Sequence, residues 1–146
     1  MTLKNSPHKL SRFSRILLAG WFVCGLMTLI SMFTTFHPSP ALARYPIVEA
    51  VVGAFLTCGS ALAIISAFDW KDESRSWSFE LLGWPLLAGA WGLYATYVIL
   101  HGPWVFPFVI GLSSFFGSVH RFMEVLFLAR QTRRNVAHYR SQTQDA

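Results

Sequence analysis

Charged residues are scarce in this chain of 146 residues: Asp, Glu, Lys and Arg together make up 13% of it. A soluble globular domain carries about 25% of such residues. The chain also lacks the low hydrophobicity that keeps segments unfolded, since 53% of its residues are hydrophobic and 16% are aromatic. This composition excludes intrinsic disorder and leaves too little polar surface to cover a water-soluble globule. The sequence therefore predicts a single domain that lies in a membrane.

Cysteines and catalytic motifs are few as well. Only Cys24 and Cys58 occur, both within apolar sequence, and their spacing matches neither a redox motif nor a metal motif. A Gly-rich phosphate loop, a nucleophile elbow and an HExxH motif are all missing. We therefore expect that the protein is not an enzyme and that it binds no cofactor.

Four apolar runs are each long enough to cross a hydrocarbon core, which takes about 20 residues of helix. We expect an all-α fold: a polytopic membrane protein with four transmembrane helices in an up-down bundle. The predicted helices cover about residues 16–36, 46–68, 79–100 and 104–129. Pro46 suits the first turn of a helix, and Pro85 predicts a kink in the third helix near Gly83.

Basic residues flank these runs and predict their orientation. The segment 1–15 carries four Lys and Arg residues, the loop after the second helix carries two, and the tail 130–146 carries four. The other side of the predicted bundle has Arg44 alone. This bias predicts a location in the cell (inner) membrane with both termini cytoplasmic and in contact with anionic lipid headgroups. Because no basic stripe crosses a folded face, we do not expect nucleic acid as a partner.

The N-terminal part also has features of a secretory signal peptide. A basic start, an apolar run and the sequence Ala41-Leu42-Ala43 would permit cleavage after residue 43. The apolar run of 21 residues is longer than the roughly 7 to 15 residues of an ordinary signal. We therefore favour a retained helix, and the mass of the intact protein distinguishes the two alternatives.

Polar residues gather on one face of the fourth predicted helix. At about 100° per residue, this face carries Ser113, Gly117, His120, Arg121 and Glu124. Charged groups inside a membrane are costly and usually face a partner or a water-filled cavity. Arg121 lies about 12 Å from the predicted cytoplasmic end, where Glu124 or Glu80 could neutralise it; Glu49 is the other possible charge partner. Arg121 is then either a structural clamp or part of a functional site, and the sequence leaves both open.

The same face offers two side chains with the spacing of metal ligands. His120 and Glu124 are four residues apart, so both could reach one ion. No matching pair lies on another predicted helix, and the adjacent Arg121 would repel a cation. We therefore expect no metal site.

Glycines recur on the predicted helices, where small residues let the backbones of membrane helices approach closely. The glycines that we expect at helix contacts are Gly20, Gly25, Gly53, Gly59 and Gly92. Such contacts serve the bundle itself, self-association or the binding of another membrane protein. The sequence does not separate these uses.

Three functions are compatible with these observations. The first is a pore-forming or permeability-altering protein that self-associates through the polar face of the fourth helix; it is similar to phage holins in size and topology only. The second is a non-catalytic accessory or scaffold subunit of a larger membrane complex. The third is a small proton-coupled exporter that uses Glu49, which is disfavoured because Glu49 lies within a turn of the outer interface.

Overall fold

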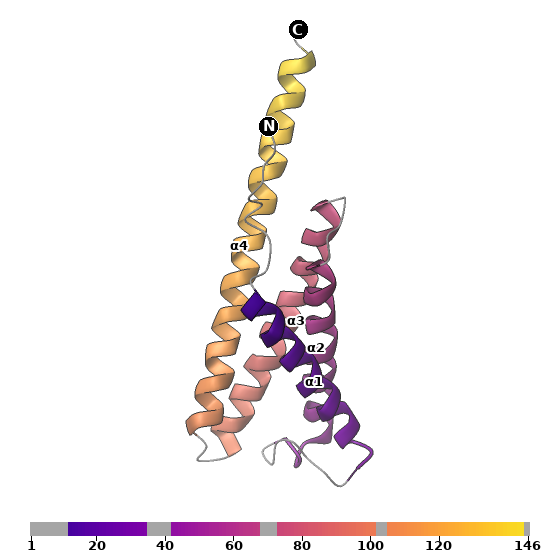
Figure 1. Ribbon diagram of the computed structural model, residues 1–146. Coiled ribbons are helices and arrows are strands. Elements are labelled where there is room, and N and C mark those ends of the chain that lie inside the picture. Colours follow the sequence, from indigo (N-terminus) through magenta and orange to yellow (C-terminus); the bar gives the residue numbers. More distant parts are fainter. Residues whose placement is uncertain (1–11, 35–41, 68–72, 102–104, 145–146) are drawn as a thin grey trace.

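The chain folds into four helices that run up and down in turn (Figure 1). The structure is a computed structural model and describes residues 12–34, 42–67, 73–101 and 105–144. The helices are α1 (Arg12–Ser31), α2 (Pro46–Ser66), α3 (Glu73–His101) and α4 (Val105–Gln144). The predicted all-helical fold is confirmed. Most of the basic segment 1–15 and Ala41 of the signal-like sequence lie outside the described residues.

The helices end at different residues from those that hydrophobicity indicates. α1 ends at Ser31, and a turn in which the Phe33 N–H donates to the Ile30 carbonyl (2.9 Å) follows it. α3 begins at Glu73 and continues through Pro85, and α4 continues through the basic tail to Gln144. The apolar runs mark where lipid or core can cover a helix, whereas helical backbone also extends through Arg and Gln, which are good helix formers.

Three helices are long and apolar enough to cross a membrane. The apolar segments are Ser14–Ser31 of α1, Pro46–Ser66 of α2 and Val105–Gln131 of α4. α3 has 29 residues and is long enough, but Trp, Tyr, Pro and Gly residues keep its most apolar stretch below the apolarity of the segments in the other three helices. Composition therefore supports three of the four predicted membrane spans.

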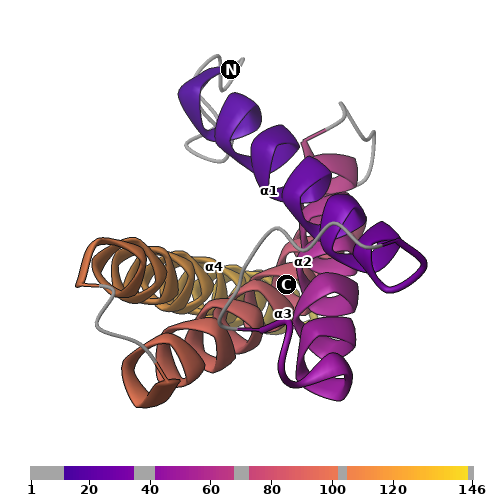
Figure 2. The same ribbon diagram turned by 90° about the horizontal axis from the view of Figure 1, so that it is seen from below.

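Each helix packs against its neighbour in the chain, so that the four form an arc (Figure 2). The backbones of α1 and α2, of α2 and α3, and of α3 and α4 lie in contact, whereas within the described residues α1 and α4 do not pack on each other. The core lies around α3, where Trp84, Leu87 and Trp91 are buried. The bundle is therefore open on the side between its first and last helices.

Glycines set the distance between neighbouring helices. A Cβ atom at Gly59 of α2 would lie 2.9 Å from the carbonyl oxygen of Gly83 on α3, and a Cβ atom at Gly25 of α1 would lie 2.6 Å from Thr57 Oγ1 on α2. Side chains at these positions would push the helices apart. The glycines found at such contacts include Gly25, Gly53, Gly59 and Gly92 of the predicted set. Gly20 lies at no contact between the described helices of the chain, because a Cβ atom there would meet nothing within 4 Å.

Candidate functional site

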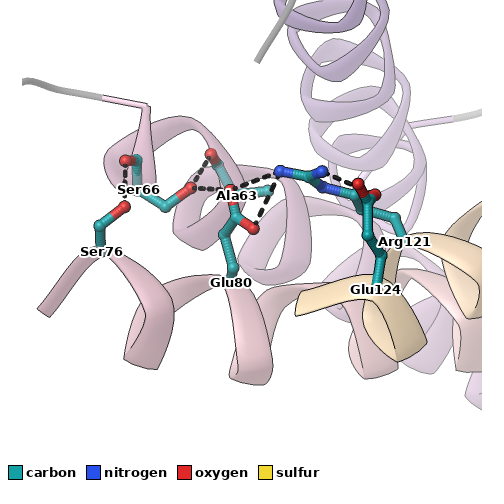
Figure 3. A network of polar contacts seen from close by, with 6 residues as sticks. All are labelled: Ala63, Ser66, Ser76, Glu80, Arg121 and Glu124. Carbon is teal, nitrogen blue, oxygen red and sulfur yellow. Dashed lines mark hydrogen bonds and ion pairs between the residues drawn. The ribbon is translucent and has the colours of Figure 1, made fainter. Parts of the chain in front are cut away.

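An ion-pair network joins α4 to α3 (Figure 3). The Arg121 guanidinium on α4 donates to Glu124 on the same helix, with Nη1 2.7 Å from Oε2, and to Glu80 on α3, with Nη2 3.3 Å from Oε2. The Glu80 side chain is 4% exposed and the Glu124 side chain 44% exposed, with Arg121 between them at 18%. Arg121 therefore contacts Glu80, which is buried, and Glu124, which is exposed, but not Glu49, the other carboxyl partner that the sequence offered.

Two serines extend this network to the end of α2. Ser66 Oγ lies 2.7 Å from the Ala63 carbonyl oxygen and 3.4 Å from Glu80 Oε1, and its hydroxyl can donate to either. Ser76 Oγ donates to the Ser66 carbonyl oxygen at 2.8 Å. The sequence does not predict the roles of these two serines, because single hydroxyl residues near helix ends form no periodic pattern. Glu80 thus receives polar contacts from α2 as well as from α4 (Figure 3).

The network lies at one end of the bundle. Ser66 is the last residue of α2 and of its apolar segment, so the contact with Glu80 brings Arg121 close to the level where α2 stops. α4 continues well beyond that level (Figure 1). Counted along α4 alone, Arg121 lies well inside the apolar segment Val105–Gln131, whereas its contact with Glu80 places it close to the level at which the apolar segment of α2 ends. In a membrane, this position would lower the cost of the charges, because headgroups and water are near.

The predicted polar face of α4 divides into two parts. Arg121 turns toward α3, whereas Ser113, Gly117 and His120 are exposed and point away from the bundle. A Cβ atom at Gly117 would meet nothing within 4 Å, and among the described residues Ser113 and His120 have no hydrogen-bond partner. Glu124 lies between the two parts, since it is exposed and also accepts from Arg121. The structure therefore leaves an exposed polar stripe on an apolar helix.

Glu49 lies at the opposite end of α2 from the network. It is in the first turn of α2, where a negative charge is favoured, and it is 1% exposed. Ser31 Oγ, at the end of α1, donates to Glu49 Oε1 at 2.8 Å and lies 2.6 Å from the Thr28 carbonyl oxygen. Ser66 follows Glu49 by 17 positions, which correspond to about 25 Å of helix. Glu49 thus belongs to the contact between α1 and α2 and is remote from Arg121.

A groove of about 480 Å³ occupies the open side of the bundle, between α1 and α4. Its lining includes Val23 and Met27 of α1, Trp91 and Tyr94 of α3, and Phe106 and Ile110 of α4. Leu42, in the turn before α2, also lines the groove. The walls are mainly apolar and aromatic, which is typical of sites for small apolar ligands.

Metal-ligating residues are scattered in the described part of the chain. No group of three or more His, Cys, Asp or Glu residues lies together there, and Cys24 and Cys58 are both free and exposed.

Comparison of the chain with protein-family models, with curated proteins and with solved structures gave no match. Function must therefore be inferred from the residues and their geometry.

Proposed function

We propose that the chain is an integral protein of the cell (inner) membrane, with four membrane-crossing helices and both termini on the cytoplasmic side. The three apolar helices support this location, and the excess of Lys and Arg at one end of the bundle supports this orientation. Four crossings return the chain to the side on which it started, as the two basic termini require.

The packing of α3 explains how this helix would cross the membrane although its most apolar stretch is less apolar than the segments of the other three helices. Its 29 residues would extend about 44 Å, more than the roughly 30 Å of a hydrocarbon core. Three of its polar or amphipathic side chains, Glu80, Trp84 and Trp91, are each less than 10% exposed. Neighbouring helices contact two of these side chains, since Trp21 of α1 packs on Trp91 and Arg121 of α4 pairs with Glu80, so lipid would contact mainly the remaining surface of α3.

We further propose that the protein alters membrane permeability by self-association through the exposed polar stripe of α4. We call this stripe the α4 face and define it as Ser113, Gly117, His120 and Glu124. The observation that carries the proposal is the exposure of these residues on a helix otherwise apolar enough to cross a membrane. Polar groups facing hydrocarbon cost several kcal/mol unless water or protein satisfies them.

Several copies that turn their α4 faces toward a common axis would remove this cost. The small side chains of Ser113 and Gly117 allow close approach of neighbouring helices, and His120 and Glu124 would border water. Arg121, at the border of the α4 face, would then hold α4 on α3 while the face itself meets the next copy.

Induced expression in a bacterium tests this function, with a potential-sensitive dye as readout and fractionation to measure insertion. The informative variant is Ser113→Leu with His120→Leu, which removes the hydroxyl and imidazole groups of the α4 face and leaves Glu124 and the ion-pair network unchanged. The matched control is Phe116→Leu with Met123→Leu, two exposed residues of α4 outside that face. We expect depolarisation by the natural chain and the control, and none by the α4-face variant at equal abundance. Equal depolarisation by all three would contradict the role of this face.

An accessory or scaffold subunit is the second candidate function. The observation in its favour is that Arg121 is neutralised within one chain, by Glu80 and Glu124, so that these charges need no water-filled path. Stable insertion without depolarisation would favour this alternative. A larger membrane protein should then co-purify in fixed stoichiometry after mild solubilisation and be lost with the α4-face variant. We do not propose a proton-coupled exporter, because Glu49, the carboxyl group that would carry the proton, is buried between α1 and α2.

A further inference from the structure

We propose that the groove between α1 and α4 binds one acyl chain of a phospholipid, with the phosphate of the headgroup at Arg44. This inference rests on the membrane insertion proposed above, but it does not depend on the proposed change in permeability.

The groove is open toward the surroundings of the bundle. The two helices at its sides, α1 and α4, do not pack on each other within the described residues, and Figure 2 shows them at the two ends of the arc. Val23 and Met27 on one side and Phe106 on the other are exposed. In a bilayer, a lipid chain could therefore enter sideways, without crossing the protein.

The walls suit a thin, flexible chain better than a further helix. Every helix contact of this fold places a glycine at the point of approach: Gly25 between α1 and α2, Gly59 between α2 and α3, and Gly92 between α3 and α4. The lining of the groove contains no glycine and includes bulky side chains such as Trp91 and Phe106. Because membrane helices dock through small residues, these walls would hold the backbone of a helix at a distance. Methylene groups can fill the space between such side chains.

A positive charge follows the lining residue Leu42 by two positions in the chain. Leu42, which lines the groove, and Arg44 share one turn, closed by a hydrogen bond from the Tyr45 N–H to the Leu42 carbonyl oxygen at 2.8 Å. The Arg44 side chain is exposed, and it forms no ion pair with another described residue. Guanidinium groups bind phosphate through two parallel hydrogen bonds. An acyl chain in the groove would thus continue to a phosphate near Arg44.

Photo-labelling of the purified full chain in phosphatidylcholine vesicles tests the groove. The probe is a phosphatidylcholine with a diazirine in one acyl chain, and mass spectrometry locates the labelled residues. Met27 and Leu26 are a matched pair at one depth on α1, 47% and 42% exposed, but only Met27 lines the groove. We expect several-fold more label on Met27. Equal labelling of Met27 and Leu26 would show that both residues contact only the surrounding bilayer, and it would overturn the proposal. If neither residue is labelled, α1 is not inserted in the membrane.

Two variants test the occupant and its headgroup. Ile110→Trp fills the groove from the α4 side, and it should lower the label on Met27 to that on Leu26, whereas Phe116→Trp, outside the groove, should not. Arg44→Gln should abolish the preference of the groove for the phospholipid probe over a diacylglycerol probe with the same chains. An unchanged preference would overturn the assignment of the headgroup to Arg44. Cross-links from Met27 to a peptide of a second copy would overturn the assignment of the groove to lipid.

Discussion

Arg121 lies between two carboxyl groups whose surroundings differ. Glu80 is buried at 4% side-chain exposure, and Glu124 is open at 44%. Removing one partner of a buried ion pair leaves an uncompensated charge, whereas an exposed pair along one helix contributes little. The two contacts of Arg121 should therefore differ in their effect on stability.

We predict that Arg121→Met lowers the free energy of unfolding by about 3 kcal/mol, the lower end of the range for breaking a buried pair, because Arg121 is partly exposed. Glu124→Gln should lower it by no more than about 0.5 kcal/mol. Equilibrium unfolding of the purified protein in detergent measures both. The double variant Arg121→Met with Glu80→Met should be more stable than Arg121→Met alone. Equal effects of Arg121→Met and Glu124→Gln would contradict the role of Glu80 as the main partner.

Sequence reasoning at the level of residues found charges but missed hydroxyls. Glu80 and Glu124 could be named as partners of Arg121 because charged residues are rare in this chain and each needs compensation in apolar surroundings. Ser66 and Ser31, which contact Glu80 and Glu49 respectively, carried no such signal. Serine is tolerated on many kinds of surface, so its role depends on which helix ends meet in the fold.

The sequence predicts the positions of the helices better than it predicts where each helix begins and ends. The apolar runs located all four helices, and Pro46 marked the start of α2 correctly. They did not show that α4 continues to Gln144 or that α3 begins at Glu73, because polar residues extend a helix without adding to its apolar run. The spacing of glycines predicted close contacts in general. Only the relative placement of the helices separates Gly59, at a contact, from Gly20, in open space.

At the crossing of α2 and α3, we predict that Gly59→Ala destabilises the protein. The new Cβ atom would lie 2.9 Å from the Gly83 carbonyl oxygen, and such overpacking costs about 1 to 3 kcal/mol. Gly20→Ala is the matched control: its Cβ atom meets nothing within 4 Å, and alanine is the better helix former by up to about 1 kcal/mol. Thermal unfolding in detergent should show a lower midpoint for Gly59→Ala alone. A lower midpoint for Gly20→Ala instead would contradict this packing.

For the whole molecule, the number of membrane crossings decides where the termini lie. Four crossings place the two basic termini on one side, whereas three crossings, with α3 outside the bilayer, would place them on opposite sides. Composition alone supports three spans, and the burial of Glu80 and Trp91 between neighbouring helices is the reason to count α3 as the fourth.

We predict that impermeant thiol reagents label Ser39→Cys in intact cells, in a background that lacks Cys24 and Cys58. Ser6→Cys and Ser141→Cys should react only after the membrane is opened, because both termini would face the cytoplasm in the proposed four-span topology. If Ser141→Cys reacts in intact cells while Ser6→Cys does not, α3 does not cross the membrane and the four-span topology is wrong.

The release of a trapped dye from vesicles that contain the purified protein tests whether the protein itself makes a membrane permeable, since no partner protein is present. We predict release by the natural chain and by Phe116→Leu with Met123→Leu. We predict no release by Ser113→Leu with His120→Leu at equal incorporation, because Glu124 would then be the one residue of the α4 face whose side chain binds water. Intact vesicles with the fully inserted natural chain, or equal release by the α4-face variant, would contradict a permeability function that depends on this face.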